Sequence, residues 1–108
     1  MNWKKIKDYD YICSKQGEIK RLPSQSSVKI FTDKGGYKFV YLWKNDKRKI
    51  FYVHILIAKT WIKELNKNKI QVDHINRNRG DNNISNLRWV TPKENLGFSH
   101  KFMPYDIY

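Results

Sequence analysis

The sequence predicts an α+β domain in which an N-terminal antiparallel β-unit and a core helix precede a strand, a loop, a second strand and a final helix. Three patterns support this fold class: aromatic and β-branched runs in the first half, one apolar stripe at helical spacing, and a late helix-start signal. The 108 residues fit one domain. Apolar residues at 40% and aromatic residues at 15% indicate a folded chain rather than a disordered tail.

Two strand units are expected in the first half. Residues 3–21 form the first, since Tyr9, Tyr11 and Cys13 alternate with polar or smaller residues and residues 15–18 favour a turn. A second hairpin follows. Residues 37–44 and 49–53 are rich in strand-forming side chains, and Asn45-Asp46 between them is typical of a turn.

A core helix of about three turns is expected next, ending near residue 66. Its apolar stripe consists of Ile55, Ala58, Ile62 and Leu65, which recur at helical spacing. Asparagine and lysine residues follow the stripe and suit the negative pole of a helix.

The rest of the chain reads strand, loop, strand, helix. Residues 69–75 and 87–90 are the expected strands, and residues 76–85 form a polar loop with Asx and Gly turn chemistry. Residues 91–94 (Thr-Pro-Lys-Glu) combine an N-cap, a proline at the first helical position and a glutamate three after the cap. This signal predicts a helix that continues to about residue 101.

The net charge of +12 predicts a polyanionic partner, either nucleic acid or an anionic surface. The first 54 residues hold 13 basic and 5 acidic residues, whereas the last 54 hold 9 and 5, so we expect the first half to dock the partner. A merely solvated basic surface is the alternative. The single Cys13 excludes an internal disulfide, and no apolar signal-peptide core or membrane span is visible. We therefore expect an intracellular protein that is not secreted.

The chemistry of the chain is concentrated around Asp73 and His74. Asn86 and Asn95 follow the histidine by twelve and twenty-one residues. A hairpin packed on a capped helix could bring an aspartate oxygen, an asparagine oxygen and an imidazole together, and oxygen ligands suit Mg²⁺ or Mn²⁺. Because neighbours on a regular strand point to opposite faces, we expect irregular backbone at residues 73–75.

These motifs resemble the HNH endonucleases of phages and group I introns, whose active site is the ββα-metal (His-Me) finger. The resemblance in the second half is carried by Val53-His54, Val72-Asp73-His74-Ile75, Asn82-Asn83, the run Asn86-Leu87-Arg88-Trp89-Val90-Thr91, and Lys93-Glu94-Asn95. Residues 3–6, 11–14 and 17–20 resemble the small N-terminal module that often precedes this finger. The last position of the motif is Asn95 rather than histidine, a variant of the phage branch.

The resemblance implies a role for each of these residues. His74 would be the general base, Asn86 would orient the loop that holds the imidazole, and Asp73 and Asn95 would bind one Mg²⁺ or Mn²⁺ per active site. Physical chemistry supports the first role, since a histidine near its free pKa of about 6.5 accepts a proton at neutral pH. An Asp-His pair without the two asparagines would be a weak signal.

Four basic residues flank this site and are candidates for DNA phosphate contacts: Arg77, Arg79, Arg88 and Lys93. Each could equally be a solvated surface charge. His54, at the start of the core helix, is expected to support the site rather than to react.

Together these features predict a divalent-metal-dependent DNA endonuclease that nicks one strand per active site. Residues 1–50 would be a basic, β-rich DNA-docking module and residues 51–108 the HNH ββα-metal nuclease module, joined in one unit. The expected partner is double-stranded DNA, with no membrane, and the protein would be a monomer or a homodimer, in the host cytoplasm if virus-encoded. The alternatives are a non-catalytic nucleic-acid-binding module with a degenerate HNH site, and a nuclease acting on RNA or single strands.

Overall fold

The N-terminal β-unit is a three-stranded antiparallel sheet in the computed structural model, which describes residues 2–64 and 69–94. Its strands are β1 (Trp3–Lys5), β2 (Tyr11–Ser14) and β3 (Ile19–Arg21), in the order β1-β2-β3. Gly17, with φ of +91°, provides the left-handed turn between β2 and β3. Cys13 is fully buried in the core. The predicted strand unit is confirmed.

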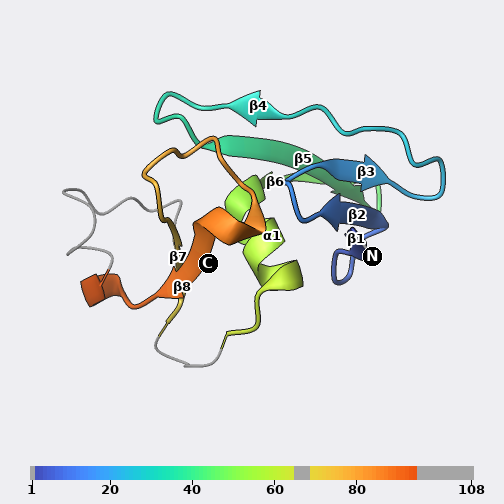
Figure 1. Cartoon of the computed structure of the whole chain (residues 1–108). Helices are drawn as coiled ribbons and strands as arrows, with labels where there is room; N and C mark the ends of the chain where they lie inside the picture. The colour runs from blue at the N-terminus through green and yellow to red at the C-terminus, as the bar shows by residue number, and fades with distance from the viewer. Residues whose placement is uncertain (1, 65–68, 95–108) are drawn as a thin grey trace.

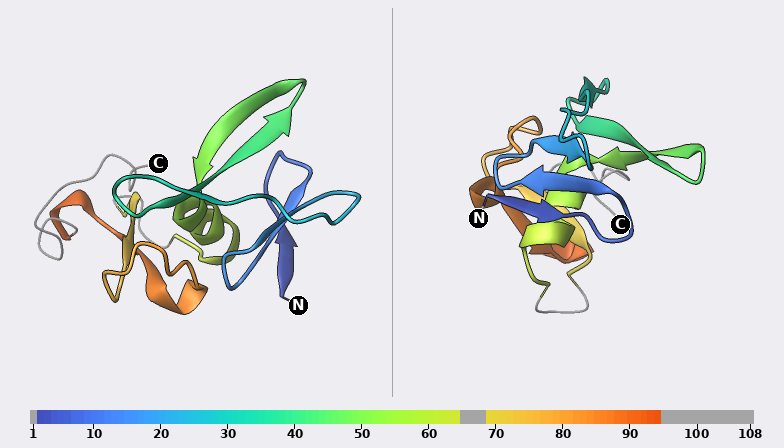
Figure 2. Two further views of the ribbon diagram at one scale, coloured as in Figure 1. Left: turned by 90° about the horizontal axis from the view of Figure 1, so that it is seen from above. Right: turned by 90° about the vertical axis from the view of Figure 1, so that its right-hand side faces the viewer.

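A second antiparallel sheet contains β4 (Phe31–Thr32), β5 (Lys38–Lys44) and β6 (Lys47–Tyr52). Asn45 and Asp46 both have positive φ, 52° and 63°, as a two-residue hairpin turn requires. The hairpin of β5 and β6 extends well beyond the rest of the molecule (Figure 2). The hairpin was expected, but the two-residue strand β4 was not.

The central helix α1 (Val53–Trp61) follows β6 without a loop and lies between the N-terminal sheet and the last two strands (Figure 1). Our prediction of a three-turn helix reaching Leu65 is wrong at this end, because Ile62 is already extended (φ −113°, ψ 111°). The carbonyl of Ile62 accepts a hydrogen bond from the indole Nε1 of Trp89 at 2.9 Å, which directs it away from a further helical turn. Among the described residues, no helix has the length and apolarity to cross a bilayer.

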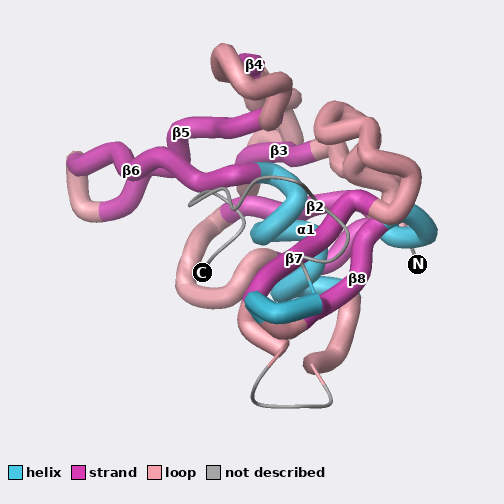
Figure 3. Tube along the Cα trace, turned by 90° about the vertical axis from the view of Figure 1, so that its left-hand side faces the viewer, coloured by secondary structure: helices cyan, strands magenta, loops and turns pink. Residues whose placement is uncertain are grey.

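The last two strands, β7 (Gln71–His74) and β8 (Leu87–Val90), form an antiparallel pair beside α1 (Figure 3). A 3₁₀ turn that we did not predict, Ile84–Asn86, leads into β8. One core cluster joins all parts: Cys13 from β2, Leu42 from β5, Ile57 from α1 and Val72 from β7. The predicted boundary at residue 50 lies within strand β6, and helix α1 contacts strands that come before and after this boundary in the sequence. The division into modules 1–50 and 51–108 therefore stays a prediction.

The predicted helix start after β8 is confirmed by reciprocal hydrogen bonds between Thr91 and Glu94. The amide of Glu94 donates to Thr91 Oγ1 at 3.0 Å, and the amide of Thr91 donates to Glu94 Oε1 at 2.9 Å. This is a capping box, in which two unsatisfied amides at a helix start find side-chain partners. Residues 92–94 are helical. The predicted continuation to residue 101, which includes Asn95, lies outside the described residues.

The Glu94→Gln variant should show less acid sensitivity than the wild type. The hydrogen bond from the Thr91 amide, followed by a side-chain hydrogen bond with Thr91 and then by the charge of Lys69, holds the pKa of Glu94 below its ordinary value of 4.5. A lowered folded-state pKa contributes stability that is present above the unfolded pKa and is lost as pH falls through the folded value. Thermal unfolding measured from pH 7 to below pH 4.5 should show a smaller drop in Tm for the glutamine variant. Parallel curves would contradict this assignment.

Candidate active site

The imidazole of His74 is held on two sides at the end of β7, where the residue is 5% exposed. On one side its Nε2 lies 2.8 Å from Asn82 Oδ1, which accepts a hydrogen bond from the ring. On the other side its ring centroid lies 4.9 Å from that of His54 and 6.0 Å from that of Tyr37. The ring is thus oriented by both a hydrogen bond and aromatic packing.

Asn82 is a site residue that our sequence reasoning missed. It was part of the family resemblance, but it received no role because it lies in a run of turn-forming residues. In the structure it is 5% exposed and its backbone packs against the β2–β3 turn: a Cβ at Gly17 would lie 3.0 Å from the Asn82 Cβ and 3.2 Å from its carbonyl oxygen. The N-terminal unit therefore supports the residue that orients His74.

Asn86 fastens the long loop between β7 and β8. Its Oδ1 accepts from the amide of Asn76 at 2.9 Å, and its Nδ2 donates to Asn76 Oδ1 at 2.9 Å and to the carbonyl of Asp81 at 3.0 Å. Asn86 itself is buried, with 7% of the residue exposed. We predicted that Asn86 orients this loop, a role that requires hydrogen bonds to loop residues such as these. That role remains a prediction.

Asp73 forms an ion pair with Arg88, its cross-strand partner in the β7–β8 ladder. Arg88 Nη2 lies 3.0 Å from Asp73 Oδ2, and Nε donates to the same oxygen at 3.1 Å. The ladder is regular through Asp73 and His74, so our expectation of irregular backbone was wrong for these two residues. Strand β7 ends at His74, and in the loop that follows the backbone of Arg77 is left-handed, with φ of 67°. Convergence of Asp73 and His74 on one ion stays a prediction.

The four predicted phosphate contacts differ in their surroundings. Arg79 is held by the protein: its Nη1 donates to the carbonyl of Gly35 at 2.9 Å, and its guanidinium lies 4.7 Å from the centre of the Tyr37 ring. Arg88 is the ion-pair partner of Asp73. Arg77 and Lys93 are exposed. Arg77 and Lys93 are therefore better placed than Arg79 to meet a polyanion.

His54 and Tyr37 form the aromatic support of His74. His54 is fully buried in the first turn of α1, and its ring lies 5.3 Å from Tyr37 and 6.0 Å from Tyr52. The supporting role that we predicted for His54 stays a prediction. Tyr37, 2% exposed, was missed, because nothing in its local sequence indicates that Arg79 and two histidines will surround it.

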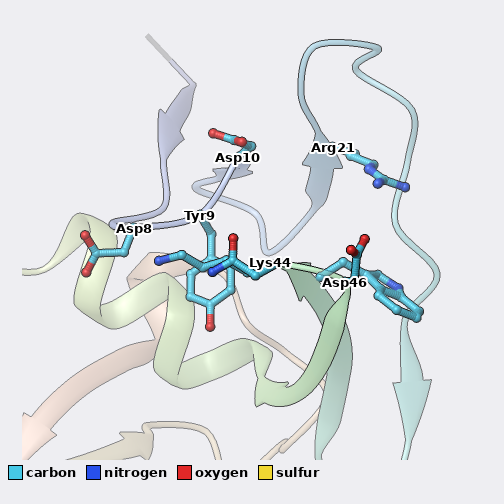
Figure 4. Close-up of a pocket in the computed structure, with 8 residues that line it drawn as sticks. Asp8, Tyr9, Asp10, Arg21, Lys44 and Asp46 are labelled. Carbon is cyan, nitrogen blue, oxygen red and sulfur yellow. The ribbon is translucent and has the colours of Figure 1, made fainter.

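A separate pocket of about 500 Å³ lies between the N-terminal unit and the β5–β6 turn (Figure 4). Its lining carries Asp8, Asp10 and Asp46 together with the cations Arg21 and Lys44. None of the predicted site residues within 2–64 and 69–94 lines it. Its charges of both signs offset one another, and we assign it no part in the chemistry around His74.

The described residues supply one ligand that suits a divalent cation, the carboxylate of Asp73. The Asp73 carboxylate is a hard oxygen ligand, which suits Mg²⁺ or Mn²⁺, and only 7% of its side chain is exposed. Residues 2–64 and 69–94 contain no cluster of three or more His, Cys, Asp or Glu side chains that could hold a metal. The second predicted ligand, Asn95, lies outside these ranges.

Comparison with known proteins defines the class of this domain. Residues 51–96 match the HNH endonuclease family, so this chain contains an HNH endonuclease domain. HNH nucleases generally depend on a divalent metal ion. The predicted resemblance and the predicted α+β fold class are thereby confirmed.

Among HNH endonucleases, the chain is similar to proteins of a phage and of a giant virus. The chain is 38% identical to the DNA endonuclease I-HmuI of Bacillus phage SP01 over 98 residues, which cover 89% of this chain and 56% of that protein. The solved structure described as DNA binding and cleavage by the HNH homing endonuclease I-HmuI matches 91% of this chain and 57% of its own, with a TM-score of 0.82. An uncharacterised HNH endonuclease of Acanthamoeba polyphaga mimivirus is 36% identical over 87 residues, covering 81% of this chain and 26% of that protein. The chain thus spans about half the length of I-HmuI.

Proposed function

We propose that this chain is a divalent-metal-dependent DNA endonuclease that hydrolyses phosphodiester bonds and nicks one strand per active site. The observation that carries the proposal is the buried His74, oriented by Asn82 and by the rings of His54 and Tyr37. This is the arrangement that a positioned general base needs. Membership of the HNH family and similarity to I-HmuI support the choice of reaction.

Each site residue has one task in this mechanism. His74 takes the proton from the attacking water, and Asn86 holds the loop that encloses the imidazole. Asp73, with Asn95, would hold one Mg²⁺ or Mn²⁺ per site. When bound, that ion would offset the negative charge that develops on the leaving oxygen. Exposed Arg77 and Lys93 would contact backbone phosphates, which adds affinity without reading sequence.

The proposed substrate is double-stranded DNA. The net charge of +12 favours a polyanion, and I-HmuI is described as binding and cleaving DNA. The N-terminal module would contribute to docking with basic strands and with the exposed hairpin, where Trp43 is 48% exposed. We propose a monomer or a homodimer that acts inside a host cell, since I-HmuI belongs to a phage.

Relaxation of supercoiled plasmid in Mg²⁺ and in EDTA tests the proposal. Metal-dependent nicking is expected. A protein that binds plasmid in both conditions but never nicks it would instead be the non-catalytic binding module. Parallel assays on RNA and on single-stranded DNA would expose a different substrate preference.

The Asn82→Ala variant should nick plasmid about 10- to 100-fold more slowly than the wild type. It removes the hydrogen bond that orients the His74 ring, and one such buried bond is worth about 1–3 kcal/mol. Asn83→Ala is the matched control, because it removes an asparagine side chain that contacts Ser85 instead of His74. Initial nicking rates and DNA affinity should be measured together. Equal rates for the two variants would remove Asn82 from the site.

A further inference from the structure

The pairing of Asp73 with Arg88 has a consequence for metal binding. The same carboxylate that is proposed to hold a divalent ion is already neutralised by a guanidinium, with contacts of 3.0 and 3.1 Å to one oxygen. The register of β7 and β8 places the two residues directly opposite each other, so the contact is built into the hairpin. Arg88 is therefore a fixed neighbour of the proposed ion.

Charge and geometry make the two cations competitors. Mg²⁺ binds carboxylate oxygens at about 2.1 Å, so an ion on Oδ2 of Asp73 would lie roughly 5 Å or less from the Arg88 nitrogen atoms that contact this oxygen. At such distances, and with an almost fully buried carboxylate, like charges repel appreciably. The arginine must then either weaken metal binding or move.

The Arg88 side chain is more accessible to a ligand from solvent than the Asp73 side chain. Its side chain is 39% exposed, whereas that of Asp73 is 7% exposed. A guanidinium can exchange a carboxylate for a phosphate without loss of geometry, because both accept its paired N–H groups. A DNA phosphate at the site offers that exchange and would leave the carboxylate available for the ion.

We infer that Arg88 is a positioning residue that couples metal binding to DNA binding: it competes with the divalent ion for Asp73 in the DNA-free protein and turns to a DNA phosphate in the complex. This inference rests on the proposed function. It predicts that DNA raises the affinity for metal, and that metal raises the affinity for DNA to the same degree. The protein would thus be loaded with metal chiefly where substrate is present.

A purely structural role for Arg88 predicts the opposite sign. If the guanidinium only held the Asp73 carboxylate in a binding orientation, its removal would loosen the site and weaken metal binding. If Arg88 instead competes with the ion, its removal should tighten metal binding. The direction of the change in metal affinity therefore decides between the two roles.

Mn²⁺ titration of the DNA-free protein, followed by calorimetry or by the EPR signal of free Mn²⁺, tests the inference. Arg88→Met, which keeps length but removes charge, should bind Mn²⁺ about 10-fold more tightly than the wild type. Arg88→Lys keeps the charge and should remain near the wild type. Arg48→Met removes a distant charge, stacked on Tyr41 in the hairpin, and controls for net charge. Unchanged or weaker binding by Arg88→Met, in a protein that unfolds as cooperatively as the wild type, overturns the inference.

A second titration, with a short DNA duplex present, tests the coupling. The His74→Ala background keeps the duplex intact. DNA should increase Mn²⁺ affinity when Arg88 is present, and the increase should be largely lost with Arg88→Met. A similar increase in both proteins would overturn the coupling. Plasmid nicking by the wild type reports separately on the proposed function: nicking with no tightening in Arg88→Met defeats this inference alone, and absence of nicking defeats the function.

Discussion

Replacing His74 with alanine is expected to slow plasmid nicking by about 10²- to 10⁴-fold, the usual contribution of a positioned general base. The variant removes the group to which we assign proton transfer from water. The ring fits between Asn82, His54 and Tyr37, so some loss of packing accompanies the loss of the base. Initial nicking rates in Mg²⁺ under single-turnover conditions are the measurement to make.

His74→Gln separates the base from the packing. Glutamine fills part of the ring volume and can still hydrogen bond to Asn82, but it cannot take a proton at neutral pH. It should be nearly as inactive as alanine, and both variants should retain wild-type affinity for a DNA duplex. Nicking by either variant at close to the wild-type rate would contradict the assignment of His74 as the base.

Replacing Asp73 with alanine is the second large effect, with nicking expected to fall by about 10³-fold. A catalytic ion contributes several kcal/mol of charge stabilisation, and each 1.36 kcal/mol corresponds to a factor of ten. Mn²⁺ affinity should fall in the same variant, because its carboxylate ligand is gone. Arg88 then loses this ion pair, but its side chain is 39% exposed and can be solvated by water, so we expect the fold to persist.

Asp10→Ala is the matched control for Asp73→Ala. Asp10 belongs to the pocket beside the β5–β6 turn, whose described lining includes no predicted site residue. Its removal should leave both nicking and Mn²⁺ affinity close to wild type. If Asp73→Ala binds Mn²⁺ as tightly as Asp10→Ala does, Asp73 is not a ligand.

Features fixed by neighbouring residues were predictable from the sequence. The capping box needs only Thr91 and Glu94, three residues apart, and the hairpin turn needs only Asn45-Asp46 between two strand-forming runs. In both cases the determining contacts lie within a few residues. His74 and Asn86 could likewise be proposed as site residues because the spacing of their motif can be read from the sequence.

Features fixed by distant residues were not predictable in this way. Helix α1 ends early because the carbonyl of Ile62 accepts a hydrogen bond from the indole of Trp89, which lies 27 positions later in the sequence. Asn82 and Tyr37 contact His74 only through the packing of three separate elements. The pairing of Asp73 with Arg88 depends on the register of β7 and β8, and a one-residue slip would have turned Arg88 to the other face.

The central claim is that a metal-dependent hydrolytic site is assembled around His74 and Asp73. The most direct test is the rate at which purified wild-type protein converts supercoiled plasmid to the open circular form in Mg²⁺, compared with the same reaction in EDTA. Our account predicts nicking in Mg²⁺, its loss in EDTA and its return when Mg²⁺ is added in excess. Equal rates in Mg²⁺ and EDTA, or binding without any nicking, would contradict it.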